Sequence, residues 1–531
     1  MNLIKNPILR GFNPDPSIIR VGEDYYIATS TFEWFPGVQI HHSRDLVNWE
    51  LVAHPLRRTT QLDMLGNPDS CGVWAPCLSY YEGTFYLVYS NVRSFDGIWK
   101  DTPNFLVTTQ DILGDWSDPI FLSSSGFDGS LFHDDDGRKW FTSMWCDHRK
   151  GKFFGGTLLQ EYDPVQQKVV GKAVQIFPGS ELGITEAPHI YKRNGYYYLI
   201  TAEGGTEYGH AVSLARSKKI EGPYELHPSN PVISVREDPS APLQKCGHAD
   251  LVETPNGEWY AVFLVGRPLT QRGRCVLGRE TAIEQVEWRE DNWLYLKQGV
   301  AVPRLEVPAP AGVELQPAAA FPARTTFNDS SLDRHFQSLR VPVEGSWLSL
   351  TDRPGYLRLY GRESLSSFHR QSLVARRVQH FQAEVSACLD FQPTHFQEMA
   401  GLVAYYNTSH WVYLHLSGGE DANHRYLQLI YCDNFDMQEK LAEPVLIPKS
   451  GEVYLRFTFD YGALEASYAL EENQWMPVGP VLDGTILADD YVRGTDRYRP
   501  AFTGTFVGMC CQDLSGHRKA ADFKWYEYVE K

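Results

Sequence analysis

The segment "FNPDPSIIRVGEDYYIA", residues 12–28, is the first of five similar segments that decide the fold. In each, a polar or aromatic lead residue and two small residues or prolines precede an apolar stretch, a turn with glycine, and a second stretch rich in aromatic residues. Glycine supplies the positive φ that a tight turn needs, so each segment predicts a β-hairpin. The other four are "VWAPCLSYYEGTFYLVY" (73–89), "FDGSLFHDDDGRKWFTS" (127–143), "TEAPHIYKRNGYYYLIT" (185–201) and "GHADLVETPNGEWYAVF" (247–263).

The spacing of the five segments is typical of propeller blades. Their lead residues lie 59, 54, 58 and 62 residues apart, which fits four strands per blade with long loops. Three further stretches follow hairpins one, two and four and are expected to contain later strands of the same blades: 42–52, 108–120 and 215–227. The repeat therefore predicts a five-bladed β-propeller over about residues 5–300, with these lead residues: Asp15, Trp74, Asp128, Glu186 and His248.

The lead residues are expected to meet at the propeller axis, because the innermost strand of each blade lines it. Three of them are acids, and like charges in one pocket raise at least one carboxyl pKa, as does burial. One protonated carboxyl that donates a proton and one carboxylate that accepts a proton from water are what glycoside hydrolysis requires. The alternative is that these acids only cap turns, but three acids at matching repeat positions favour a shared site.

The second half of the chain has a different pattern. Residues 303–325 are rich in Pro and Ala and are expected to be a linker between domain 1–302, the catalytic propeller, and domain 326–531. Short alternating stretches such as "EVYLRFTFDYG" (452–462), separated by turn residues, predict a β-sandwich in the last domain. The chain is therefore expected to be all-β.

Composition excludes several classes of function. The net charge of −17 makes a nucleic-acid partner unfavourable. The sequence has no apolar run of transmembrane length and no signal-peptide pattern, so we expect no membrane partner. Nine cysteines without a CxxC pair indicate reduced, mostly buried thiols, which favours a cytoplasmic location.

Several motifs resemble the β-xylosidases of glycoside hydrolase family 43: "NPDPS", "WAPCL", "GFDGSLFHDDDGRKW", "TEAPHIY", "GHADL" and, near the C-terminus, "FTGTFVGMCCQD". The resemblance covers the whole chain and implies a propeller followed by a concanavalin-like sandwich. It implies that Asp15 is the general base, that Glu186 is the general acid, and that Asp128 orients Glu186 and tunes its pKa. It also implies inversion of anomeric configuration.

The resemblance extends to the substrate contacts. Phe32 and Trp74 are expected to form aromatic walls around the sugar, and Arg279 and Thr206 to reach its hydroxyls. A loop of the sandwich is expected to close the mouth of the pocket, with Phe506 at its tip and Phe502 as the alternative.

The role of His248 has three interpretations. It contacts substrate or a water, ligates calcium, or is structural. Glu186 and His189 form a Glu-x-x-His pair, but residues three apart on a strand point to opposite faces, which argues against a shared metal. No cofactor is required by the chemistry, and calcium at His248 stays possible.

The resulting functional hypothesis is an exo-acting β-1,4-xylosidase that acts on xylobiose and short xylo-oligosaccharides from the nonreducing end. Two alternatives stay open: an α-L-arabinofuranosidase, alone or as a second activity, and a catalytically inactive sugar-binding propeller. The resemblance also implies a homo-oligomer, either a dimer or a tetramer.

Overall fold

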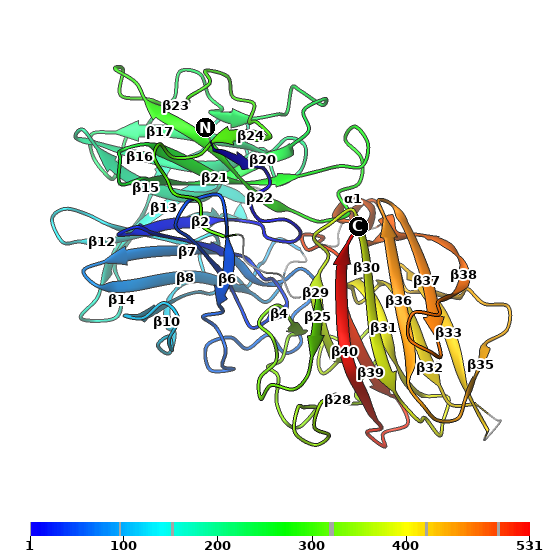
Figure 1. Ribbon diagram of the computed structural model, residues 1–531. Helices are drawn as coiled ribbons and strands as arrows, with labels where there is room; N and C mark the ends of the chain where they lie inside the picture. Colours follow the sequence, from blue (N-terminus) through cyan, green and yellow to red (C-terminus); the bar gives the residue numbers. More distant parts are fainter. Residues whose placement is uncertain (1, 95–96, 150–152, 318–322, 420–422, 496–499) are drawn as a thin grey trace.

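The computed structural model describes residues 2–94, 97–149, 153–317, 323–419, 423–495 and 500–531. The chain forms two all-β parts that lie against each other (Figure 1). The N-terminal part is a propeller, and the C-terminal part is a sandwich of two sheets.

Each propeller blade is an antiparallel sheet whose strands follow chain order, so each hairpin of the repeat supplies the two inner strands. Stretches 42–52, 108–120 and 215–227 join the third strand of a blade to the fourth, as the sequence predicts. The five blades are β2 (Ser17–Val21), β3 (Asp24–Thr29), β5 (Gln39–Ser43) and β6 (Glu50–Ala53); β7 (Gly72–Tyr81), β8 (Thr84–Val92), β9 (Asn104–Thr109) and β10 (Ile120–Ser123); β11 (Ser130–His133), β12 (Lys139–Cys146), β13 (Phe154–Asp163) and β14 (Lys168–Phe177); β15 (Glu186–Arg193), β16 (Tyr196–Glu203), β17 (Ala211–Ser217) and β18 (Glu225–Leu226), with β19 (Ile233–Ser234) on β17; and β20 (Gln244–Glu253), β21 (Trp259–Gly266), β22 (Glu280–Trp288) and β23 (Leu294–Leu296).

The blades close into a ring because the innermost strands β2, β7, β11, β15 and β20 contact one another in turn, and β20 contacts β2. The N-terminal segment fastens the first blade to the last. The Ile8 amide donates to the Thr281 carbonyl (2.9 Å), and the Asn13 amide donates to the Arg279 carbonyl (2.9 Å). The predicted five-bladed propeller is confirmed.

The predicted linker 303–325 is wrong in its first part. Residues Glu306–Pro308 form strand β24, which pairs with β1 (Leu3–Lys5) at the start of the chain. This part of the segment therefore belongs to the propeller, because its backbone groups are paired there. Residues 318–322 of the predicted linker lie outside the described residues.

The C-terminal part consists of two stacked sheets with a large apolar core between them. A short 3-10 helix, η2 (Gly484–Leu487), precedes the helix α1 (Asp489–Thr495). None of the helices within the described ranges is long and apolar enough to cross a membrane. One sheet contains β27 (Leu348–Ser349), β28 (Leu357–Tyr360), β40 (Ala520–Glu530), β30 (Gln382–Asp390), β36 (Val453–Asp460), β37 (Ala463–Ala469) and β38 (Met476–Asp483), with β25 (Arg324–Thr326) on β40; the other contains β34 (Asp436–Glu439), β33 (His424–Asp433), β32 (His410–Ser417), β31 (Glu398–Asn407), β39 (Phe506–Asp513), β29 (Ser372–Arg377) and β26 (Gln337–Leu339), with β35 (Val445–Pro448) on β33.

One strand of the second sheet comes from the propeller. Strand β4 (Trp34–Phe35) leaves the first blade and pairs with β26 of the sandwich, with Ser338 opposite Phe35. The same junction holds a buried apolar cluster with members from both parts: Phe12, Phe32, Trp34, Trp74, Phe127, Leu339, Tyr405 and Phe506 among others. Phe32 and Trp74, two predicted walls of the sugar pocket, therefore belong to a core that both domains build.

Candidate active site

A backbone kink accompanies each lead residue: Asp15, Asp128 and Glu186 lie at or just before the start of their innermost strands, whereas Trp74 and His248 lie at register shifts within β7 and β20. Asp15, Asp128 and His248 have φ values of 56°, 54° and 50°. At the other two positions the kink falls on the next residue, at Ala75 and Ala187, with φ values of 31° and 47°. This conformation costs a residue with a side chain about 1–3 kcal/mol. Its recurrence at all five repeat positions indicates that the kinks orient the lead side chains.

The five lead residues line one cavity of about 60 Å³, as the repeat predicts. Three other predicted site residues, Phe32, Thr206 and Arg279, line it too. Phe127, His210 and Phe502 complete the wall. The cavity is therefore a ring of carboxylates and imidazoles enclosed by aromatic rings and one guanidinium.

Asp15 is held as a carboxylate. The Ser30 hydroxyl donates to Oδ2 (2.7 Å), Arg279 Nη1 donates to Oδ1 (3.2 Å), and His248 Nδ1 lies 3.6 Å from Oδ1. Burial raises the pKa of Asp15, but Arg279, His248 and Ser30 together outweigh it, so this pKa is lowered from 3.8. Asp15 is thus ionised at neutral pH and suited to accept a proton.

The pKa values of Glu186 and Asp128 are raised, in contrast to that of Asp15. Burial and the negative charge of Asp15 raise the pKa of Glu186 to about 8, against the lowering effect of Arg279. Burial, followed by the charges of Glu186 and Asp15, raises the pKa of Asp128 well above its usual value. Both carboxyl groups therefore favour the protonated form at neutral pH. One cavity thus combines a proton acceptor with proton donors.

Arg279 connects the base to both domains. Besides Asp15, it donates to the Thr206 hydroxyl (2.9 Å) and, through Nη2, to the Phe502 carbonyl (2.9 Å). Its guanidinium lies 5.3 Å from the centre of the Phe32 ring. The side chain is only 5 % exposed, so these contacts fix it between the propeller and the sandwich loop.

The prediction that Phe506 closes the pocket is wrong, and the alternative Phe502 occupies that place. Phe506 begins β39, is fully buried, and stacks on Trp34 with ring centres 3.7 Å apart. Phe502 precedes that strand and packs edge-on against Trp74 at 5.5 Å. Its amide donates to the Ser70 hydroxyl (3.0 Å), which fixes the loop to the propeller.

A second cleft of about 350 Å³ adjoins the cavity, and five residues line both: Trp74, Phe127, Glu186, Thr206 and Phe502. Ile98, Phe153, Phe154 and Ile184 make the rest of this cleft largely apolar. Glu186 therefore lies at the boundary between a small polar cavity and a wider apolar cleft. A proton donor at that boundary can reach the oxygen that joins two sugar units.

Sequence reasoning missed two residues of the wall, Phe127 and His210. Phe127 directly precedes Asp128, so its position in the repeat was the available signal. His210 lies in the loop before β17, away from the repeat positions, and its Nδ1 lies 3.1 Å from the Lys245 carbonyl. Burial lowers the pKa of His210 to about 3 and that of His248 to about 4, so both rings are neutral at neutral pH.

The surroundings of His248 do not suit calcium. Calcium takes six to eight oxygen ligands, whereas here an imidazole and the Arg279 guanidinium flank the Asp15 carboxylate. Within the described ranges, no group of three or more His, Cys, Asp and Glu side chains is arranged to hold a metal ion. This includes the Glu186 and His189 pair, whose histidine lies 3.6 Å from Asp250 instead.

Comparison with known proteins agrees with this geometry. Residues 4–294 match the model of glycosyl hydrolases family 43, and residues 324–529 match the β-xylosidase C-terminal concanavalin A-like domain. A β-xylosidase of Bacillus subtilis (strain 168) is 51 % identical, with 99 % of this chain and 100 % of that protein covered. A xylosidase/arabinosidase 43B of Humicola insolens is 50 % identical, with 99 % and 98 % covered.

A solved structure is equally close. The xylan β-1,4-xylosidase from Bacillus halodurans C-125 superimposes with a TM-score of 0.96 at 52 % identity, over 99 % of this chain and 100 % of the other. The family model covers more than half of the chain, and its match coincides with the propeller that carries the three acids. The chain therefore belongs to glycosyl hydrolases family 43 and is a glycoside hydrolase.

Proposed function

We propose that this enzyme is an exo-acting β-1,4-xylosidase that removes xylose from the nonreducing ends of xylobiose and short xylo-oligosaccharides, with inversion. The proposal rests on one observation: two carboxyl groups of the cavity, Asp15 and Glu186, differ in protonation state at neutral pH. Asp15 is an ionised carboxylate beside Arg279, and Glu186 is a protonated carboxyl at the boundary with the outer cleft. The β-xylosidases that are similar over the full chain support the choice of sugar.

In the proposed reaction Glu186 donates its proton to the glycosidic oxygen as the bond from that oxygen to the anomeric carbon breaks. Asp15 takes a proton from a water molecule, and the water oxygen forms the new bond to the anomeric carbon from the opposite face. Glu186 ends as a carboxylate and Asp15 as an acid, and proton exchange with solvent restores both. We assign to Asp128 the role of orienting Glu186 and tuning its pKa, which is supported by the position of both carboxyl groups in one cavity.

Exo action is supported by the shape of the site. The inner cavity is small and Phe502 and Trp74 close it, so it suits a terminal sugar rather than the middle of a chain. The apolar outer cleft suits the face of the leaving sugar, because sugar rings pack well on aromatic side chains. Hydrolysis by this acid and base requires no cofactor.

An α-L-arabinofuranosidase is the second candidate, because the Humicola insolens relative is a xylosidase/arabinosidase. We expect kcat/KM for p-nitrophenyl β-xyloside to exceed that for the α-L-arabinofuranoside, and xylobiose with a β-1,4 bond to be cleaved faster than the β-1,3 isomer. NMR of the first-formed sugar is expected to give α-xylose. A preference for the arabinoside or for the β-1,3 bond would overturn the substrate assignment, and β-xylose would overturn inversion.

The pH dependence of kcat/KM follows from the two pKa shifts. Asp15 must be ionised and has a pKa below 3.8, so activity is lost only as the pH falls through that lowered value. Glu186 must be protonated and has a pKa of about 8, so activity is lost as the pH rises through about 8. We therefore expect a broad plateau between these limits for p-nitrophenyl β-xyloside. An alkaline limb close to pH 5 would contradict this environment for Glu186.

We also propose a cytoplasmic location, which is supported by the thiols. The nine cysteines all lie within the described residues and form no disulfide. The homo-oligomer that the family resemblance implies stays a prediction, and its measurement is the solution mass of the purified chain.

A further inference from the structure

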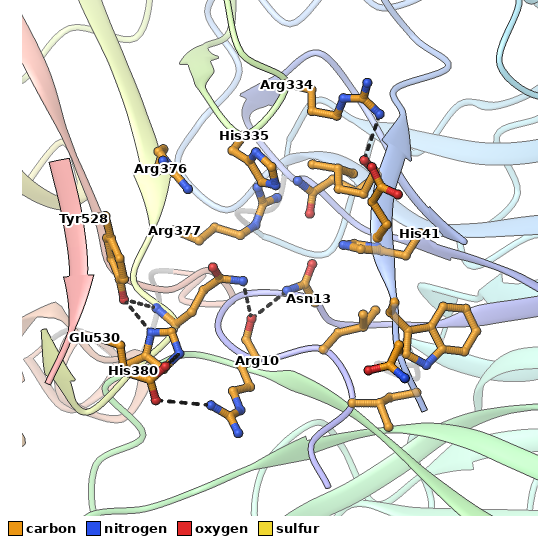
Figure 2. Close-up of a pocket in the computed structure, with 18 of the residues that line it drawn as sticks. Arg10, Asn13, His41, Arg334, His335, Arg376, Arg377, His380, Tyr528 and Glu530 are labelled. Atoms are coloured by element: carbon orange, nitrogen blue, oxygen red, sulfur yellow. Dashed lines mark hydrogen bonds and ion pairs between the residues drawn. The ribbon is translucent and has the colours of Figure 1, made fainter. Parts of the chain in front are cut away.

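The propeller and the sandwich meet in two different ways. Over part of their boundary a cleft of about 860 Å³ lies between them, and Arg10, Arg334 and Tyr528 are among the residues that line it (Figure 2). The described residues that line this cleft include none of those that line the active-site cavity. Elsewhere the helix α1 of the sandwich, which precedes Phe502 in the chain, contacts the propeller directly. This second contact is the one that reaches the active site.

A buried ion cluster fastens α1 to the propeller. The ammonium of Lys245, on β20, lies 2.6 Å from Asp490 of α1 and 3.2 Å from Glu207, which lies in the loop between β16 and β17. The Lys245 side chain is only 1 % exposed. Asp490 also accepts a hydrogen bond from the Cys275 amide (2.8 Å). Because separating buried charges from their partners is costly, these contacts fix the start of α1 on the propeller.

Arg493, near the end of α1, extends from this cluster to the aromatic wall of the cavity. Nη1 donates to the Glu207 carboxylate, and Nη2 donates to the carbonyl of Ala501 (2.5 Å), the residue before Phe502. The guanidinium carbon lies 4.8 Å from the centre of the Phe502 ring, within the range of a cation–π interaction. The described residues that line the cavity do not include Arg493, so it contacts the Phe502 ring from outside the cavity.

Glu207 connects the same arginine to a second wall of the cavity. It directly follows Thr206, and both Thr206 and His210 line the cavity. The Glu207 carbonyl accepts a hydrogen bond from the His210 amide (2.9 Å), so the three residues belong to one compact loop. Arg493 is therefore bound on one side to the loop that carries Thr206 and on the other side to Phe502.

We infer that Arg493 is a positioning residue for the sugar in the inner cavity: it anchors Phe502 to the loop of Thr206 and thereby sets the affinity of the cavity for its sugar. Arginine suits this role because its planar fork donates in two directions while its face packs on a ring. Arg493 acts through Phe502, so the acid and the base stay in place without it. The inference rests on the proposed function only for the identity of the sugar.

Arg493→Gln is expected to raise KM for p-nitrophenyl β-xyloside about fivefold and to weaken xylose binding, measured by calorimetry, to the same extent, because a cation–π contact and a hydrogen bond are lost. The value of kcat is expected to change by less than about twofold, since substrate and transition state lose the same contact. A merely structural defect would lower the fraction of active enzyme, and hence kcat, without changing KM. Unchanged KM and xylose affinity, or a loss confined to kcat, would overturn the inference.

A double-mutant comparison tests whether Arg493 acts through Phe502. Phe502→Ala alone is expected to raise KM about 10-fold, because the aromatic wall is lost. Addition of Arg493→Gln to that variant is expected to raise KM no further, because the ring that Arg493 holds is already absent. Multiplication of the two effects in the double variant would show that Arg493 acts by another route, against the inference.

Glu207→Gln keeps the test decisive should Arg493→Gln fail to fold, as judged by circular dichroism. Glutamine retains an acceptor oxygen for Arg493 but not the charge, so KM and the dissociation constant for xylose are expected to rise about twofold. No rise in either variant would overturn the inference.

Arg334→Gln is the matched control, because Arg334 also crosses the domain boundary. Its Nη1 donates to the carbonyl of Leu51 (3.0 Å) on β6, the outermost strand of the first blade, beside the cleft of Figure 2. This variant is expected to leave KM and xylose binding unchanged. Should the wild-type enzyme prefer the arabinofuranoside, the substrate assignment fails, and the same ratios measured with that substrate and with arabinose test Arg493.

Discussion

Replacement of Glu186 by glutamine is expected to lower kcat/KM for xylobiose by about 10³-fold or more, because positioned general acid–base catalysis contributes roughly 10²–10⁴-fold. Glutamine has nearly the same shape but cannot donate a carboxyl proton to the glycosidic oxygen. A dinitrophenyl xyloside has a leaving group that needs little protonation. Its hydrolysis is expected to fall far less, by about 10-fold.

The ratio of the two losses is the diagnostic quantity, since a merely structural defect would reduce both substrates alike. Glu181→Gln is the matched control, because Glu181 is an exposed acid in the loop that leads to β15. It is expected to keep full activity on both substrates. Equal losses for xylobiose and the dinitrophenyl xyloside in Glu186→Gln would remove Glu186 from the role of general acid.

Asp15→Asn is expected to abolish hydrolysis of both substrates, with a loss of about 10³–10⁴-fold in each kcat/KM. Water must be activated whatever the leaving group, so a good leaving group cannot compensate for the missing base. The asparagine can still accept the hydrogen bond from Ser30, which keeps the side chain in place. Binding of xylose to the variant, measured by calorimetry, is expected to persist and to separate lost chemistry from lost structure.

The control for this variant is Asp118→Asn, which removes an exposed acid 2.9 Å from Arg58 on the rim of the propeller. It is expected to leave both substrates unaffected. Retention of dinitrophenyl xyloside hydrolysis by Asp15→Asn would show that another group activates the water.

The propeller and its three acids were predictable because the same hairpin pattern occurs five times in the sequence. The five hairpins mark equivalent positions, and equivalence was enough to predict that Asp15, Asp128 and Glu186 share a cavity. The local signals of each hairpin, an apolar alternation and a turn glycine, agree with the fold that forms.

Features that depend on pairing between distant segments were not predictable. The choice between Phe502 and Phe506 depends on where β39 begins, and its partner strands set that point. The pairing of Glu306–Pro308 with the first strand likewise has no local signal. His210 enters the site on a loop outside the repeat, so equivalence could not reveal it.

The attachment of Phe502 has a consequence for the order in which products leave. Its amide is held by Ser70 and its carbonyl by Arg279, so the loop is fastened on both sides of the ring. In the proposed reaction the leaving sugar lies in the outer cleft, which shares five lining residues with the inner cavity. We therefore expect the leaving sugar to depart first and the xylose in the inner cavity to follow it. Accumulated xylose would bind again in the empty inner cavity and compete with substrate.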